Sequence, residues 1–169
     1  TGDMFACGDV TPDIMTLSKA LTGGTLPLAA TVANQKVFGA FLSDDPAKAL
    51  MHGPTFMANP LACAAANASL DLFESEPRLD QARALGELLR VGLAPCRKVA
   101  GVKDVRVKGA IGVVELEKIN DVAALKKRFV EAGVWVRPFG NTVYLTPALN
   151  MAADDAGLLT HAVVRIVSG

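Results

Sequence analysis

Residues 13–24 read DIMTLSKALTGG, and this stretch does more than any other to decide the fold. Its apolar run, residues 14–18, is typical of a short buried strand. Lys19 stands where that strand stops, and Gly23 and Gly24 then predict a turn. A lysine at the end of a buried strand is poorly solvated, which lowers its pKa and frees the amine to attack a carbonyl. Lys19 is therefore a candidate Schiff-base nucleophile, with an ordinary surface lysine as the alternative.

The rest of the first part of the chain is punctuated by glycine and proline. We expect a second strand at residues 28–33, a short helix at 35–42 and an irregular loop at 51–60. Asn59 is placed to cap a helix over residues 60–74, whose many alanines predict close packing. Pro77 follows, and a domain boundary is expected there.

After Pro77 the pattern changes to α+β. Apolar residues recur at helical spacing over residues 79–89, and Asp121 and Gly133 are placed to begin and end another helix. Strands are expected at residues 102–107, 110–116, 134–136 and 142–146. An apolar stripe over residues 158–166 predicts a final helix.

Composition excludes several classes of function. Seventeen basic residues balance seventeen acidic ones, which leaves no electrostatic signature for nucleic acid or an anionic membrane. Three widely spaced cysteines and two histidines resemble neither a disulfide framework nor a metal site. The apolar stretches are too short to span a bilayer, and no signal peptide opens the chain, so we expect a cytoplasmic protein. Because the chain begins with Thr1, we expect a processed, cloned or truncated product.

Other residues are candidates for binding. Gly53, Pro54 and Thr55 form a turn whose hydroxyl and N–H groups suit a phosphate, unless it is an ordinary loop before a helix. Arg137 closes an apolar stretch and is either a bidentate carboxylate receptor or a strand-end arginine that reaches water. Tyr144 is a candidate substrate-binding residue on the neighbouring strand, or simply a half-buried strand residue.

The motifs resemble those of a known family. Residues 13–24 resemble the segment that carries the cofactor lysine in class III aminotransferases, which depend on pyridoxal 5'-phosphate (PLP). Residues 51–66, 104–115 and 133–140 are very similar to the branch of that family that acts in biotin biosynthesis. The resemblance implies an α/β chain with part of the type I PLP-transferase fold. Residues 1–76 would end the large PLP-binding domain, and residues 77–169 would form a small C-terminal α+β domain.

The resemblance also implies roles. Lys19 would bind PLP and transfer a proton, Pro54 and Thr55 would bind the PLP phosphate of the partner subunit in a homodimer, and Gly53 would lie near substrate. Arg137 would bind the carboxylate of 8-amino-7-oxononanoate, a small-molecule substrate that receives an amino group from S-adenosylmethionine and becomes 7,8-diaminononanoate.

Other readings stay open. An ω-amino acid transaminase or an aminomutase of the same class would share these motifs, and a non-catalytic folded remnant would need none of the roles. Complete chains of the family are more than twice as long and carry a Gly-Ser phosphate loop, an aromatic residue on the pyridine ring and an aspartate at the ring nitrogen. We therefore expect this chain to have little activity alone.

Overall fold

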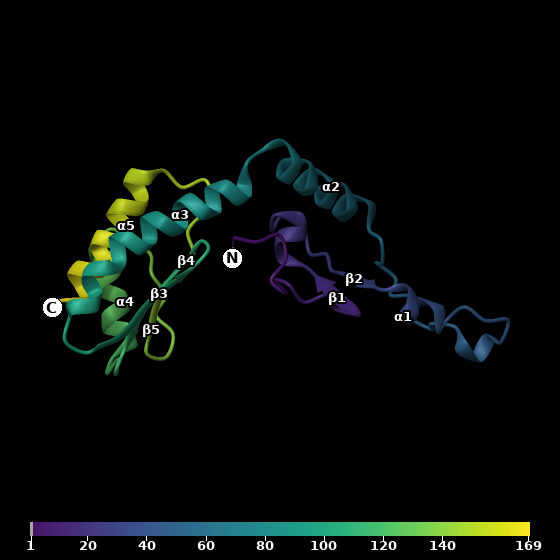
Figure 1. Ribbon diagram of the computed structural model, residues 1–169, viewed down its shortest axis with the longest axis horizontal. Coiled ribbons are helices and arrows are strands. Elements are labelled where there is room, and N and C mark those ends of the chain that lie inside the picture. The colour runs from purple at the N-terminus through teal and green to yellow at the C-terminus, as the bar shows by residue number, and fades with distance from the viewer. Residues whose placement is uncertain (1) are drawn as a thin grey trace. The chain divides into compact units, whose positions relative to one another are not determined.

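The computed structural model describes residues 2–169; Thr1, the first residue of the expected large-domain segment, lies outside the described residues. The chain divides into two compact units, one over residues 7–77 and one over residues 78–169 together with residues 2–6 (Figure 1). The change of unit therefore falls directly after Pro77.

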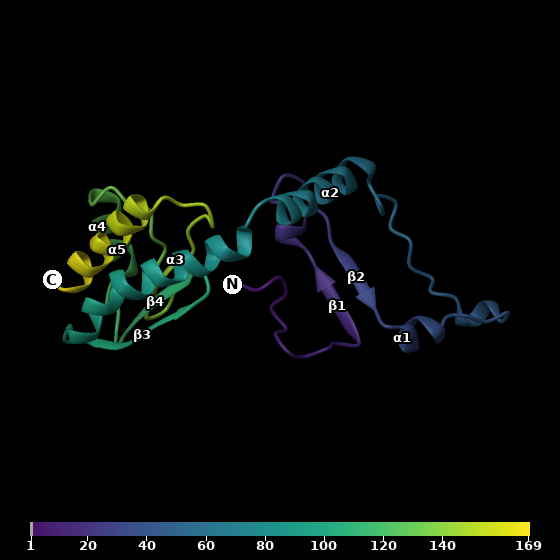
Figure 2. The same ribbon diagram turned by 45° about the horizontal axis from the view of Figure 1, so that its top comes forward.

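The unit over residues 7–77 is built on a pair of short strands. Strand β1 (Ile14–Leu17) pairs with β2 (Ala30–Ala33) in antiparallel register, as the two opposed arrows in Figure 2 show. The 3-10 helix η1 (Lys19–Thr22) lies between them in the chain and packs against helix α2 (Pro60–Ser75). Helix α1 (Gln35–Gly39) and the 3-10 helix η2 (Pro46–Lys48) connect β2 to α2.

Helix α2 begins where the sequence predicts. The Asn59 side chain accepts hydrogen bonds from the N–H groups of Leu61 and Ala62, at 3.0 and 3.2 Å, and Pro60 occupies the first turn. Ala62 and Ala66 are buried, whereas Ala64 and Ala68 are exposed, so the expected close packing holds for one face of this helix and is wrong for the other.

The prediction of a buried strand at residues 14–18 is wrong about burial, although a strand does form there. Strand β1 forms, but its side chains alternate between exposed and half-buried. Within residues 2–169 it pairs with β2 alone, and α2 packs mainly on η1 rather than on the strand. An apolar run sets the propensity for a strand, whereas burial depends on what covers it.

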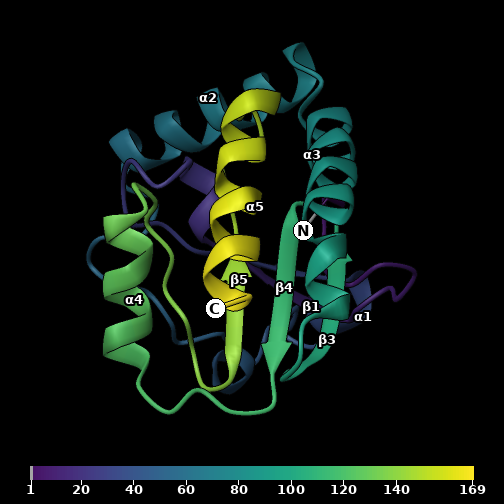
Figure 3. The ribbon, with the colours of Figure 1, turned by 90° about the vertical axis from the view of Figure 1, so that its left-hand side faces the viewer.

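The unit over residues 78–169 has helices on one face of a three-stranded sheet (Figure 3). The antiparallel sheet has the order β3-β4-β5, formed by Val102–Lys108, Ile111–Leu116 and Thr142–Leu145. Helices α3 (Arg78–Leu93), α4 (Val122–Glu131) and α5 (Ala153–Val167) cover it, and the 3-10 helix η3 (Ala94–Lys98) follows α3.

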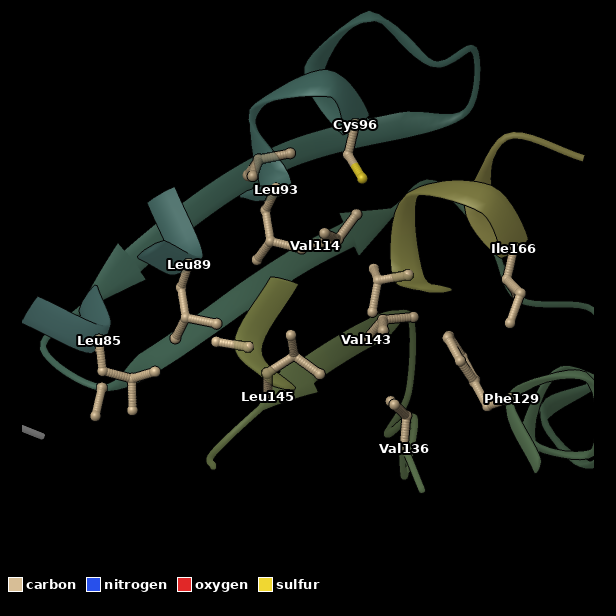
Figure 4. Packing of buried hydrophobic residues seen from close by; sticks show 14 of the residues in the cluster. Leu85, Leu89, Leu93, Cys96, Val114, Phe129, Val136, Val143, Leu145 and Ile166 are labelled. Atoms are coloured by element: carbon tan, nitrogen blue, oxygen red, sulfur yellow. The ribbon is translucent and has the colours of Figure 1, made fainter. Parts of the chain in front are cut away.

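A single apolar core joins this sheet to its helices (Figure 4). Leucines of α3 at helical spacing, Phe129 of α4 and Ile166 of α5 meet the inward valines of the strands. The buried side chains include Leu85, Leu89, Leu93, Cys96, Val105, Val114, Phe129, Val136, Val143, Val163 and Ile166. The predicted helical and strand periodicities are thus confirmed here, and burial raises the pKa of the Cys96 thiol.

The predicted strand over residues 134–136 is wrong. These residues are not in a strand, although Val136 is buried in the core. The segment is held instead by Val134 N–H, which donates to Phe129 O at 3.0 Å, and by paired bonds between Phe139 and Thr142. It therefore runs from the end of α4 towards β5 without joining the sheet as a strand.

An ion-pair cluster links β3 to β4. The Glu115 carboxylate accepts hydrogen bonds from Lys103 at 2.8 Å and from Arg106 at 2.7 Å, and these bonds hold its pKa below the usual value. Arg106 also reaches Asp104 at 2.9 Å. Because the two cations are exposed, we assign the cluster a small part in stability.

Substitution by alanine at two glycines of this unit is expected to change the free energy of unfolding in opposite directions. A Cβ atom at Gly92 would stand 2.4 Å from the Thr160 hydroxyl oxygen, between α3 and α5, whereas one at Gly157 on α5 meets nothing within 4 Å. Gly92→Ala should lower the free energy of unfolding by about 1–3 kcal/mol through overpacking. Gly157→Ala should raise it by about 0.5–1 kcal/mol. Urea unfolding followed by circular dichroism measures both, and equal effects would contradict this packing.

Candidate active site

Lys19 has an unusual backbone. Its φ of 50° lies in the left-handed region, which residues other than glycine rarely adopt. Ser18 before it is extended and donates its hydroxyl hydrogen to Leu28 O at 2.8 Å, while Gly23 ends η1 with φ of 59°. Such strain persists only where the surrounding contacts hold it, and it is concentrated at functional sites.

The contacts that hold this turn centre on Thr22. Its side chain is buried, and its hydroxyl donates to Leu26 O at 2.6 Å. Thr25 donates in turn to Thr22 O at 2.8 Å, and Ser69 of α2 donates to Ala20 O at 3.0 Å. The chain is thereby fixed on the C-terminal side of Lys19, which lines a shallow cavity of about 300 Å³ together with Ser18, Thr22 and residues 24–28.

The prediction of a buried lysine is wrong, because Lys19 is exposed. Its side chain borders the open cavity at this turn and is not enclosed by it. Its amine is accessible to a carbonyl compound, and its position is set by the turn rather than by burial.

The Gly53, Pro54 and Thr55 turn is exposed and is stabilised locally. Met57 N–H donates to Pro54 O at 2.9 Å, and Ala58 has φ of 53° before the helix cap. Within residues 2–169 the Thr55 hydroxyl has no hydrogen-bond partner, so it is available to an anion. The turn at Thr55 and the turn at Lys19 belong to the same unit.

Arg137 and Tyr144 line one open cleft of about 500 Å³ in the other unit. Arg137 is exposed and forms no ion pair with the described residues, whereas Tyr144 is half-buried on β5. Apolar side chains complete the walls, among them Trp135 of the segment and Leu158 of α5. The cleft therefore offers a cation, a phenolic hydroxyl and an apolar surface together.

Sequence reasoning missed two polar members of this cleft, Thr146 and Asp155. Asp155 lies in the first turn of α5, where a carboxylate interacts favourably with the helix dipole. Only the packing of α5 beside β5 shows that the same carboxylate also borders the cleft. Thr146 directly follows β5 and lies two residues after Tyr144, and this short spacing is the one sequence signal that could have identified it.

The exposed amine of Lys19 and the exposed hydrogen-bond donors of the Thr55 turn suit the aldehyde and the phosphate of PLP. An aldehyde needs a primary amine, which Lys19 provides, and a phosphate needs hydroxyl and N–H donors, which the Thr55 turn provides. Within residues 2–169 no three histidine, cysteine or acidic side chains gather closely enough to hold a metal ion. None of the described helices has the length and apolarity needed to cross a bilayer.

The chain is similar to known proteins over both of its units. The profile of the family described as Aminotransferase class-III matches residues 1–167. An adenosylmethionine-8-amino-7-oxononanoate aminotransferase of Corynebacterium glutamicum is 41% identical over all of the chain, which covers 40% of that protein. The same kind of enzyme from Mycobacterium leprae is 43% identical over 98% of the chain and 38% of its own length. The chain thus spans about 40% of the length of these relatives.

Solved structures agree. The adenosylmethionine-8-amino-7-oxononanoate aminotransferase of Methanocaldococcus jannaschii matches 99% of the chain with a TM-score of 0.89 at 31% identity, over 42% of its length. A PLP-bound amine transaminase from an uncultivated Pseudomonas species matches 95% with a TM-score of 0.84 at 34% identity, over 39% of its length. The predicted α/β fold, part of the PLP-transferase fold, is confirmed. The chain belongs to the class III aminotransferase family, whose cofactor is pyridoxal phosphate.

Proposed function

We propose that the protein transfers an amino group from S-adenosylmethionine to 8-amino-7-oxononanoate and makes 7,8-diaminononanoate, a step of biotin biosynthesis in the cytoplasm. The observation that carries this proposal is the cleft in which Arg137 and Tyr144 meet an apolar wall. A long aliphatic carboxylate needs this combination. The names of the relatives at about 40% identity support the same substrates.

Lys19 is proposed as the catalytic residue. When bound, PLP supplies the electron sink that stabilises charge at the substrate carbon. The Nζ atom of Lys19 would bind the cofactor aldehyde and, once released, would move a proton at the reacting carbon. The left-handed turn and its hydrogen bonds fix the direction in which the Lys19 side chain leaves the backbone.

The turn at residues 53–55 is proposed to complete the site of a second subunit. Thr55 would donate to the PLP phosphate of the partner, Pro54 would hold the turn in place, and Gly53 would lie beside substrate. The protein would then be a homodimer. In this proposal residues 1–76 form the end of the large domain and residues 77–169 form the small domain.

Arg137 is proposed to bind the carboxylate end of the substrate. Its guanidinium has no competing partner within residues 2–169, so both of its N–H edges are free for a bidentate contact. Tyr144 would add a hydroxyl from β5, and the side chain of Trp135 would lie against the aliphatic chain.

The choice of amino donor tests this assignment. The natural gene product that contains this sequence, supplied with PLP and 8-amino-7-oxononanoate, should form 7,8-diaminononanoate with S-adenosylmethionine as donor. Mass spectrometry measures the product, with β-alanine as the comparison donor. Activity with β-alanine alone would indicate an ω-amino acid transaminase and contradict the proposal. No activity with any donor would favour a non-catalytic protein.

A further inference from the structure

We infer that the Lys126 ammonium, stacked on the indole of Trp135, positions the segment that carries Arg137 and so improves capture of carboxylate substrates. This inference rests on the proposed role of Arg137. Lys126 and Trp135 are positioning residues here, because they act through Arg137 rather than on the reacting atoms.

The segment that carries Arg137, residues 133–139, is anchored at both ends. At its start, Gly133 and Val134 donate to Val130 O and Phe129 O, at 2.9 and 3.0 Å. At its end, Phe139 and Thr142 exchange two backbone hydrogen bonds of 2.9 Å each. Arg137 lies between these two anchors and takes no part in their backbone hydrogen bonds.

Side chains alternate along the segment between the anchors. Val136 is 2% exposed, whereas Trp135 on one side of it and Arg137 on the other are exposed. Such alternation is typical of an extended chain, which sends neighbours at i and i+2 to the same side. Pro138 also restricts Arg137 to extended backbone. Trp135 and Arg137 both border the same cleft. We therefore expect a fixed ring at Trp135 to restrict the conformations open to the Arg137 side chain.

Lys126 supplies the contact that fixes Trp135. Its Nζ atom lies 4.8 Å from the ring centroid, within the range of a cation–π interaction. The neighbouring Lys127 pairs instead with Glu131 at 3.7 Å. With 66% of its surface exposed, Trp135 has few other contacts to hold its ring. Its fixed ring gives Arg137 a rigid apolar neighbour before any ligand binds, and preorganisation of this kind improves affinity.

The contact can be measured directly, since Trp135 is the only tryptophan of the chain. In the 169-residue chain, Lys126→Ala should uncover the ring and raise acrylamide quenching of its fluorescence. Lys126→Arg keeps the cation and should restore the original quenching, and Lys127→Ala is the matched control on the same helix. Equal quenching in Lys126→Ala and Lys127→Ala would overturn the inference.

Kinetics then test the consequence in the natural gene product. Lys126→Ala should raise KM for 8-amino-7-oxononanoate by about 2- to 5-fold with little change in kcat, whereas KM for its methyl ester should stay the same. Lys126→Arg should restore KM for the acid, and Lys127→Ala should leave both values unchanged. An equal rise for acid and ester would show that the contact merely supports the pocket, and would overturn the positioning role.

Arg137→Leu separates the two proposals. It should raise KM for the acid far more than KM for the ester. If it does not discriminate between them, the proposed carboxylate role of Arg137 fails. If it does discriminate while Lys126→Ala behaves as Lys127→Ala does, the role of Arg137 stands and the inference about Lys126 and Trp135 is wrong.

Discussion

Lys19→Ala is expected to lower kcat/KM for transamination by about a thousandfold or more, because one change removes both the amine that binds PLP and the group that moves the proton. General acid–base catalysis alone contributes about 10²- to 10⁴-fold. The assay is product formation by the natural gene product at saturating PLP. Alanine is compatible with a folded chain here, because the exposed Lys19 side chain contributes nothing to the core.

The control for this variant is Lys36→Ala, at an exposed lysine of α1 in the same unit. It should leave kcat/KM unchanged within about twofold, since surface changes away from a site have small effects. Lys19→Ala activity within tenfold of the unchanged protein would contradict the assignment. Such a result would make Lys19 an ordinary surface lysine in a strained turn.

Phe129→Ala is expected to lower the free energy of unfolding by about 3–5 kcal/mol, the largest effect on stability that we predict. Phe129 is 0% exposed, and its ring lies among Val136, Val143 and Ile166 in the core (Figure 4). Truncation removes its apolar contacts and leaves a cavity between α4 and the sheet. A loss of this size is a large fraction of the total stability of a domain.

Urea unfolding of the 169-residue chain, followed by circular dichroism, measures this change. Val130→Ala is the matched control, because Val130 is the next residue of α4 and is 51% exposed. It should change the free energy by about 0.5 kcal/mol or less. A loss below about 1 kcal/mol for Phe129→Ala would mean that α4 does not close this core.

The sequence predicts best where periodicity and burial report the same contact. Leu85 and Leu89 on α3, and the valines of β3 and β4, alternate or recur because they face one core. The pattern over residues 134–136 is equally apolar, yet the bonds at Val134 and Phe139 go to Phe129 and Thr142 and leave no strand. Which partner a backbone group finds is a nonlocal outcome, and an apolar run does not encode it.

In the candidate site, too, some features can be predicted from the sequence and others depend on nonlocal contacts. The residue types at Lys19, Thr55 and Arg137 can be read from the sequence because their chemistry is specific. The left-handed backbone of Lys19 cannot, since glycine is the usual signal of that conformation. The cleft around Arg137 depends on how β5 folds back beside the segment and on α5, which begins at Ala153, packing near it, and neither placement can be read from the sequence.

The most direct test of the central claim is chemical fixation of PLP on the protein. One equivalent of PLP is added to the natural gene product, the mixture is reduced with borohydride, and its peptides are mapped by mass spectrometry. We predict a pyridoxyl group on the peptide that contains Lys19 and its loss in Lys19→Ala. An adduct spread over other lysines, or absent from Lys19, would contradict the account.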